Sequence, residues 1–390
     1  MSEKIVITAA ARTPMGGFQG AMAEASAAQL GAAAIAAAVE RSGLKPEAID
    51  EVIMGCVLAA GQGQAPARQA SLGGGLPLST GCTTINKMCG SGMKATMLAH
   101  DLLLAGSNHA MLAGGMESMS NAPYLLPKAR AGLRMGHGQV LDHMFLDGLE
   151  DAYDKGCLMG SFAEATADKY QFSREAQDEF AITSLKRAQA AIEEGAFAAE
   201  ITPVLMKTRK GEVSVDTDEQ PHNARIDKIP SLRPAFRADG TVTAANSSSI
   251  SDGAAALVLM RQRDAGDRAI AVIQGHATHA QEPAWFTTAP VAAIKKLLEK
   301  INWSADEVDL YEINEAFAVV TMAAMHDLGL DHARVNVNGG ACALGHPIGA
   351  SGARILVTLI SALQRRGLKK GVAALCIGGG EATALAVELI

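Results

Sequence analysis

The chain is poor in aromatic residues and has neither a strongly basic segment nor a long apolar run. Aromatic side chains make up 4% of the 390 residues and apolar residues 48%, so we expect a core of closely packed aliphatic residues, alanine and glycine. No run of Lys or Arg exceeds three residues and the net charge is −7, which excludes a nucleic-acid partner. The apolar run at 31–39 has about half the roughly 18 residues that cross a membrane, so no membrane association is expected.

Cysteine is scarce and irregularly placed. Six cysteines without a Cys-x-x-Cys pair fit neither a disulfide framework nor a zinc site, so we expect reduced thiols and no metal. The one close histidine pair, His276 and His279, is predicted to lie in a loop without a nearby cysteine. The first residues, MSEKIVITAAARTP, resemble a strand and lack the basic and apolar regions of a signal peptide, which predicts a cytoplasmic protein.

One motif occurs twice: a turn of small residues with a reactive side chain, then a helix, then an apolar strand that ends in glycines. The first copy has Cys89 in its turn and Gly114-Gly115 after its strand. The second has His346 in its turn, and Cys376 stands just before Gly378–Gly380. A fold duplicated in this way brings corresponding strand ends together, so the three reactive groups are predicted to share one pocket.

The duplication extends beyond the motif. Residues 32–55 align with residues 291–314 without a gap, at a constant offset of 259 (291 − 32 = 259). The same offset carries Cys89 to position 348, within two residues of His346. The two functional turns therefore fall at matching places in the two copies.

Each copy alternates strands with helices, which favours a mostly parallel sheet covered by helices on both faces. The expected strands are KIVITA, EVIMGC, HAMLAGG, AIAVIQG, VDLYEIN and GVAALCIGG, and the expected helices span 27–42, 91–105, 291–301 and 351–366. Residues 119–248 are more charged and irregular, and contain a helix that Ser173 is predicted to cap. This region is interpreted as an insertion for substrate binding and assembly.

Cys89 and His346 are the candidate nucleophile and base. A thiol at a helix N-terminus gains from the helix dipole and free N–H groups, which predicts a lowered pKa for Cys89. Gly345 and Pro347 flank His346 in a rigid turn, from which an imidazole can accept a proton at physiological pH. A buried structural cysteine and a structural turn histidine are the alternatives.

The other candidates lie at strand ends. Cys376 is a possible acid and base, and the glycines beginning at Gly378 can point N–H groups into a cavity as an oxyanion hole requires. Asn314, where VDLYEI gives way to a helix, can orient a water or donate to a developing negative charge. The alternatives are a packed strand cysteine and a helix-capping asparagine. Walker-type, G-x-S-x-G and strand-to-helix G-x-G-x-x-G motifs are absent from the sequence, which argues against nucleotide and serine hydrolysis.

Taken together, NKMCGSGMKA, NEAFA, NVNGGACALGHPIGASGAR and CIGGGEA resemble the signature segments of the thiolase family. The resemblance extends from ITAAARTP to the C-terminus. It implies an α/β fold with a five-layered αβαβα core built from two duplicated βαβ halves, with an inserted loop domain. The implied divisions are residues 1–118 with about 249–268 for the N-terminal half, 119–248 for the insertion, and 269–390 for the C-terminal half.

The resemblance also implies roles. Cys89 matches the acylated nucleophile, His346 its base and Cys376 the acid and base at the substrate's α-carbon. Asn314 matches the residue that holds a water in the enolate oxyanion hole, and the N–H groups of Cys89 and Gly378 match a second hole. Coenzyme A thioesters are then substrates, and no cofactor is implied. The implied substrate contacts are Leu149, Met159, Phe236, Ser248, Phe286, Ala316 and Phe317.

The implied activity is that of a short-chain acetyl-CoA C-acetyltransferase, and the segment 124–149 resembles the loop through which such enzymes form tetramers as dimers of dimers. Several positions depart from the family pattern. Leu158 replaces a histidine near the acyl group. Around His222 a basic contact to the CoA phosphates is replaced, for which Arg225 can compensate. Glu381-Ala382 replaces Met-Gly, Trp285 and Phe286 are bulky, and Cys342 has no assigned role. A degradative thiolase for longer acyl chains and a non-catalytic acyl-CoA-binding protein stay open as alternatives.

Overall fold

The computed structural model describes residues 3–208 and 211–390. Its strands are β1 (Ile5–Arg12), β2 (Gly16–Gly17), β3 (Glu51–Gly55), β4 (Gly81–Ile85), β5 (Ala110–Ser118), β6 (Tyr124–Leu125), β7 (Leu141–Asp142), β8 (Val204–Thr208), β9 (Gly211–Val215), β10 (Ser251–Arg261), β11 (Ala271–Ala280), β12 (Leu310–Ile313), β13 (Lys370–Ile377) and β14 (Glu381–Leu389). Its α-helices are α1 (Ala27–Ser42), α2 (Pro66–Gly73), α3 (Ser91–Ala105), α4 (Met159–Tyr170), α5 (Arg174–Glu193), α6 (Gln220–Asn223), α7 (Gln262–Ala265), α8 (Ala289–Ile301), α9 (Ala318–Leu328), α10 (Ala341–Leu344) and α11 (Ser351–Arg366).

The main sheet has the strand order β12-β13-β14-β11-β1-β10-β5-β3-β4, with β2 paired to β10. Among the described strands, its two halves join where Val6 of β1 pairs with Val272 of β11 and Ile7 with Ala271. The expectation of a mostly parallel sheet is wrong. Only β3–β4, β3–β5 and β12–β13 pair in parallel among the described strands. One reason is that β14 follows β13 through a short glycine turn and must run back beside it. The strand β10 also lies antiparallel to β5, to which it returns after the insertion.

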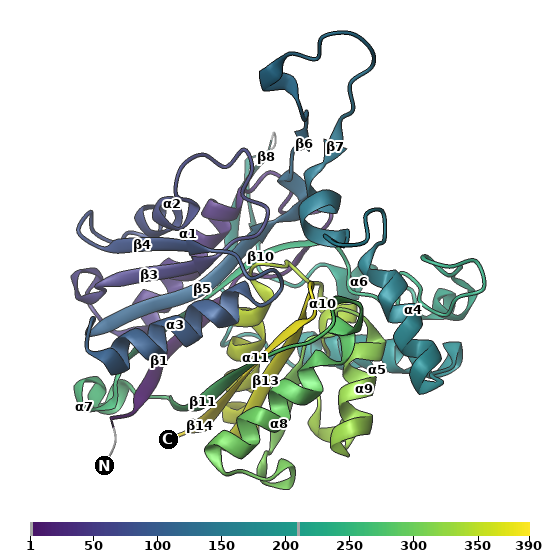
Figure 1. Ribbon diagram of the computed structural model, residues 1–390. Coiled ribbons are helices and arrows are strands. Elements are labelled where there is room, and N and C mark those ends of the chain that lie inside the picture. The colour runs from purple at the N-terminus through teal and green to yellow at the C-terminus, as the bar shows by residue number, and fades with distance from the viewer. Residues whose placement is uncertain (1–2, 209–210) are drawn as a thin grey trace.

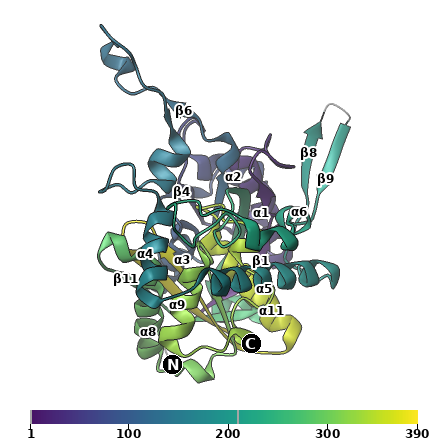
Figure 2. The same ribbon diagram turned by 90° about the vertical axis from the view of Figure 1, so that its right-hand side faces the viewer.

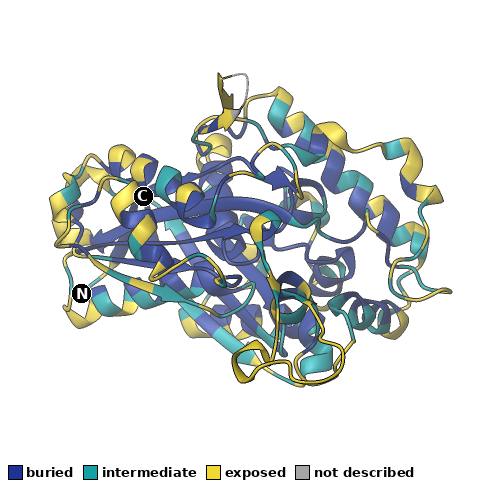
Figure 3. Ribbon diagram, turned by 90° about the horizontal axis from the view of Figure 1, so that it is seen from above, coloured by how far each residue is buried: buried dark blue, intermediate teal, exposed yellow. Residues whose placement is uncertain are grey.

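The predicted five-layered core is confirmed by three buried hydrophobic clusters. One lies between the first half of the sheet and the outer helices α1 and α2, and another lies between the second half and α8 and α9. The third fills the space between the two halves, where α3 and α11 pack against each other. Figure 1 shows α3 and α11 between the strands of the two halves, and Figure 3 shows that the strands through the middle of the molecule are buried.

Two glycines let α3 and α11 meet at their N-terminal ends. A Cβ on Gly92 would stand 2.8 Å from the backbone nitrogen of Ala353, and one on Gly352 would stand 2.5 Å from that of Met93. Both distances are shorter than real side chains show, so only glycine fits. The starts of the two central helices, and the turns before them, are thereby held side by side.

The gapless internal repeat is confirmed. Helices α1 and α8 end at Ser42 and Ile301 (301 − 42 = 259), and β3 and β12 begin at Glu51 and Leu310 (310 − 51 = 259). The helices expected at 27–42, 91–105 and 351–366 have those bounds, whereas α8 begins two residues before the expected 291. Ser173 caps α5 as predicted, since its hydroxyl accepts the N–H of Ala176.

Between β5 and β10 the chain leaves the layered core. Helices α4 and α5 cover one side of the molecule, and the hairpins β6–β7 and β8–β9 project from it in Figures 1 and 2. His276 and His279 lie in β11 and not in a loop, because Ala271–Ala280 pairs along its length with β14. Among the described residues, no helix is both long and apolar enough to span a bilayer.

Candidate active site

The turns before α3 and α11 open onto a cavity of about 380 Å³. Cys89, His346 and Gly378 line this cavity. All seven predicted substrate contacts line it as well: Leu149, Met159, Phe236, Ser248, Phe286, Ala316 and Phe317. A second hollow of about 340 Å³, beside Ile192 and Phe197, has no cysteine or histidine among its lining residues. The structure therefore brings the predicted reactive groups and the predicted binding residues to the same place.

A strained, hydrogen-bonded turn holds Cys89 at the cavity wall. Met88, the preceding residue, has a φ of 47°, in the left-handed region that side chains disfavour. The hydroxyl of Ser91 accepts the N–H of Lys87 at 2.8 Å and donates to the carbonyl of Met88 at 2.7 Å. These two hydrogen bonds stabilise the turn, which places the thiol before the first residue of α3.

The prediction of a lowered pKa for Cys89 is wrong. Burial raises the pKa of its thiol to about 11, and Glu117 adds to the rise. The N–H groups of Gly378 and of Cys89 itself donate toward the sulfur and lower the pKa, but by less. The N–H groups at the helix N-terminus lower the pKa of Cys89 as expected. The free-energy cost of moving the charged thiolate out of water is larger, so the net shift of the pKa is upward. Cys89 is therefore a neutral thiol at pH 7 and needs a base in order to attack.

His346 has the tautomer of a base. Its Nδ1 lies 2.5 Å from the hydroxyl of Ser351, which itself donates to the carbonyl of Pro347 at 2.9 Å. Since that hydroxyl proton is engaged, Nδ1 must carry the imidazole proton, and Nε2 keeps its lone pair. Nε2 is buried and has no hydrogen-bond partner within the described residues. Burial, with the nearby Arg354 cation, lowers the pKa of His346 to about 3, so the imidazole is neutral.

Cys376 is buried at the end of β13, directly beside Cys89. Burial raises the pKa of its thiol well above the ordinary value, and the neighbouring Cys89 raises it further. The chain then turns through Gly379 and Gly380, with φ values of 92° and 90° that only glycine adopts readily. This turn presents the N–H of Gly378 to the sulfur of Cys89. Cys376 itself is not among the residues that line the cavity, but it lies behind them.

Asn314 is buried at the end of β12, and both polar atoms of its amide lack a partner within the described residues. It is not a helix cap, because α9 begins at Ala318 with Phe317 as its N-cap. An unpaired buried amide costs about 1–3 kcal/mol, which indicates that it is kept for a ligand or a water. Asn314 does not line the cavity either.

Three functional residues were not predicted from the sequence. Ser351 orients His346, and its position in GASG matches that of Ser91 in CGSG (351 − 91 = 260). The internal repeat could therefore have identified Ser351.

The second residue is Glu117. It accepts the N–H groups of Val57, Leu58 and Gly349 at 2.9–3.1 Å, and burial raises the pKa of its carboxyl to about 7. It joins the end of β5 to the loop that carries His346.

The third residue is Glu315, next to Asn314. Its carboxylate accepts hydrogen bonds from the side chains of Ser184 and Asn336, at 2.7 and 2.8 Å, and from the N–H of Cys342 at 3.1 Å. Cys342, for which the sequence suggested no role, thus contributes a backbone donor to this network. The network fixes the backbone beside Asn314.

The positions that depart from the family pattern fall in different places. Leu158 and Phe286 line the cavity, whereas Trp285 does not and packs instead under the ammonium of Lys169, 4.3 Å from its ring centre. Glu381 forms an ion pair with Lys87 beside the Cys89 turn. His222 and Arg225 are exposed and lie outside the cavity lining.

Comparison with known proteins gives consistent matches over the whole chain. The family described as "Thiolase, N-terminal domain" matches residues 5–263, and "Thiolase, C-terminal domain" matches residues 267–389. The chain is 50% identical to "Acetyl-CoA acetyltransferase" of Chromobacterium violaceum over 390 residues, which cover 99% of each chain. It is 50% identical to "Acetyl-CoA acetyltransferase 2" of Arabidopsis thaliana over 392 residues, which cover 99% of this chain and 97% of the relative.

A solved structure supports the fold. The Bacillus anthracis acetyl-CoA acetyltransferase superposes with a TM-score of 0.97 at 42% identity, with 100% of this chain and 99% of that chain covered. The layered core and the segment between β5 and β10 thus have their counterparts in a crystal structure.

Proposed function

The chain belongs to the thiolase family, and from this premise we propose that it is an acetyl-CoA C-acetyltransferase. The proposed reaction is the reversible Claisen condensation of two acetyl-CoA molecules to acetoacetyl-CoA and free CoA. One observation carries the proposal: the thiol of Cys89 faces a cavity that it shares with the partnerless Nε2 of His346, while two N–H groups point at its sulfur. We infer the substrate, acetyl-CoA, from the names of the relatives.

In the first half-reaction, the sulfur of Cys89 attacks the thioester carbonyl of acetyl-CoA. Its proton passes to Nε2 of His346, which is neutral and carries a lone pair. The carbonyl oxygen becomes negative and is held by the N–H groups of Cys89 and Gly378, which in the resting protein donate toward the sulfur that this carbonyl carbon joins. The bond to the CoA sulfur then breaks, and the leaving thiolate takes the proton of Cys376. An acetyl-cysteine, an imidazolium and the Cys376 thiolate remain.

In the second half-reaction, the Cys376 thiolate removes a proton from the methyl carbon of a second acetyl-CoA. Because burial holds the pKa of Cys376 well above its ordinary value, this thiolate is a strong base. The enolate oxygen is stabilised by the imidazolium of His346 and by a water held on Asn314. The carbanion attacks the acetyl-cysteine, and the released Cys89 sulfur recovers its proton from His346. All three groups return to their neutral resting forms.

The proposal is tested by intact-protein mass spectrometry after mixing with acetyl-CoA. We expect one acetyl group on Cys89 and one equivalent of released CoA. Cys89→Ala should show neither, while Cys82→Ala, at a half-buried cysteine of β4 outside the cavity, should behave like the wild type. Binding of acetyl-CoA without an adduct would instead identify a non-catalytic acyl-CoA-binding protein.

The resting charges predict a flat pH profile for acetylation. His346, with a pKa lowered to about 3, is neutral and keeps the lone pair of Nε2 free at every pH above that value, and Cys89, with a pKa raised to about 11, stays protonated below pH 11. The rate of CoA release in a single turnover is expected to stay level between about pH 5 and pH 9. A clear fall of that rate below about pH 6.5, the ordinary pKa of histidine, would contradict a neutral His346.

Ser351→Ala is expected to lower the single-turnover acetylation rate by roughly 10- to 100-fold. This factor corresponds to the loss of one buried hydrogen bond to a group that becomes charged in the reaction. The loss should appear in kcat with little change in KM, because Ser351 contacts His346 and not the cavity. Ser361→Ala, at a buried serine later on α11, is the matched control. Equal rates for the two variants would show that Ser351 does not orient the base.

A thiolase for longer acyl chains is the second candidate, and one observation favours it. The cavity wall includes Leu158, Leu149, Met159 and Phe236, and apolar side chains of this kind suit an acyl chain. Thiolysis rates measured on a series of 3-ketoacyl-CoA substrates decide between the two. A rate that is highest for acetoacetyl-CoA supports the proposed activity, and a rate that is highest at six or more carbons supports the second candidate.

We further propose a cytoplasmic homotetramer that uses no cofactor, arranged as a dimer of dimers. The edge strand β4 has partly exposed residues and an unpaired side, which suits strand pairing with a second copy. The hairpin β6–β7 exposes Tyr124 and Met135 to solvent, which suits a second contact. The proposed divisions are residues 1–118 with about 249–268, 119–248 for the insertion, and 269–390. Light scattering of the purified protein measures the assembly.

A further inference from the structure

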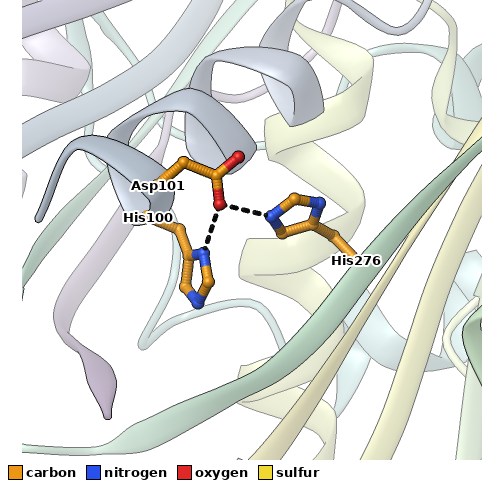
Figure 4. Close-up of side chains that lie close together, drawn as sticks. All are labelled: His100, Asp101 and His276. Atoms are coloured by element: carbon orange, nitrogen blue, oxygen red, sulfur yellow. Dashed lines mark hydrogen bonds and ion pairs between the residues drawn. The ribbon is translucent and has the colours of Figure 1, made fainter. Parts of the chain in front are cut away.

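A second cluster of reactive side chains lies away from the cavity (Figure 4). His100 and Asp101, in the last part of α3, meet His276 of β11, and their ligand atoms all lie within 4.8 Å of one another. One carboxylate oxygen of Asp101 is 2.9 Å from Nδ1 of His100 and 2.9 Å from Nε2 of His276. Across residues 3–208 and 211–390, no other group of three or more such side chains converges in this way.

The two halves of the fold both contribute to this cluster. His276 is 175 residues from Asp101 in the chain, so no local sequence motif predicts the cluster. The rings of His100 and His276 stand edge to face with their centres 5.1 Å apart, which fixes their mutual orientation. The cluster lies about 16 Å from Cys89 along the axis of α3, at 1.5 Å per residue. It is thus separate from the proposed catalytic groups.

The geometry of the cluster suits a cation. A single oxygen of the Asp101 carboxylate faces one nitrogen of each imidazole, so one acidic oxygen and two ring nitrogens converge on one point. Both rings are 12% exposed and the carboxylate is 54% exposed, so an ion can reach the cluster from solvent. The ammonium of Lys300 is a nearby charge of the same sign as a metal ion, and it donates to the backbone carbonyl of His276 at 3.1 Å.

We propose that His100, Asp101 and His276 bind one divalent transition-metal ion of the Zn²⁺ or Co²⁺ type. Two imidazole nitrogens and one carboxylate oxygen are ligands that such ions prefer, and a water completes the tetrahedron. Binding replaces the two hydrogen bonds to Asp101, and each imidazole moves its proton to the other ring nitrogen, so no net proton is released. The ion would connect α3 of the first half to β11 of the second.

Co²⁺ is the probe of choice, because thiolate ligands give it a charge-transfer absorption that nitrogen and oxygen ligands do not. Calorimetric titration of the purified wild type is expected to show one equivalent of Co²⁺ per chain, without that absorption. His276→Gln and Asp101→Asn should weaken this binding by roughly tenfold or more. Co²⁺ should also raise the melting temperature of the wild type and not that of His276→Gln.

The matched control is His326→Gln. His326 also contacts a neighbouring carboxylate, that of Asp327, at 2.8 Å, but within the described part of the chain no second histidine ligand joins this pair. This variant should bind Co²⁺ as the wild type does. Binding by His276→Gln as tight as that of the wild type, binding that shows thiolate absorption, or no binding at ~1 mM Co²⁺, a weak limit for a protein site of three ligands, would each overturn the proposal.

Discussion

Cys376→Ala is expected to retain the acetylation of Cys89, because the CoA thiolate, whose thiol has an ordinary pKa of about 8.5, can leave without its proton donor. The same variant is expected to lower the condensation of two acetyl-CoA molecules by ~10²- to 10⁴-fold, the usual contribution of a general acid and base. The expectation follows from position and charge. Cys376 is buried beside Cys89 at the end of β13, and its raised pKa makes its thiolate a strong base. No other thiol lines the cavity within the described residues except that of Cys89, which is occupied by the acetyl group during this step.

Two measurements separate the half-reactions in this variant. Mass spectrometry should find the acetyl group on Cys89, because its attack depends on His346 and on the N–H groups of Cys89 and Gly378. Condensation should be almost absent in a steady-state assay. Exchange of solvent deuterium into the methyl group of acetyl-CoA, which needs the same proton transfer, should fall by a similar factor. Normal exchange with slow condensation would assign the proton transfer to another group.

The reactive residues were accessible from the sequence because each sits in a local pattern with its own physical reason. A glycine-rich turn before an apolar helix placed Cys89, and the repeat at offset 259 placed His346 beside it. The helices expected at 27–42, 91–105 and 351–366 are α1, α3 and α11, with those bounds. Patterns of this kind extend over a few turns of chain, which is the range that sequence reasoning covers.

The features that could not be predicted from the sequence depend on contacts between residues that are far apart in the chain. The rise in the pKa of Cys89 comes from burial by both halves, and a local helix-dipole argument gave the opposite sign. The direction of β10 depends on its pairing with β5 across the whole insertion, so alternation alone suggested too many parallel strands. Ser351 was recognisable only by comparing the two turns, and His276 only from its place on β11.

The charges buried between the core and the insertion are expected to dominate stability. Arg12 is fully buried at the end of β1, where two of its nitrogens contact the carboxylate of Asp218 at 2.7 and 2.9 Å. Its Nε contacts the carboxylate of Glu200 at 2.5 Å, and its guanidinium lies 4.8 Å from the ring centre of Phe197. Burial disfavours the cation, but these two carboxylates hold the pKa of Arg12 above its ordinary value.

Arg12→Met is therefore expected to lower the free energy of unfolding by ~3–5 kcal/mol, because it removes the cation that contacts the two buried carboxylates. Arg263→Met is the matched control: its partner Glu3 lies 3.0 Å away on the surface, and an exposed pair contributes less than about 1 kcal/mol. Melting temperatures measured by calorimetry at equal protein concentration compare the two variants.

Adding Asp218→Asn and Glu200→Gln to Arg12→Met should restore part of the lost stability, since neutral amides tolerate burial better than unpaired carboxylates. A melting temperature for Arg12→Met equal to that of Arg263→Met would show that the buried cation does not hold the insertion on the core.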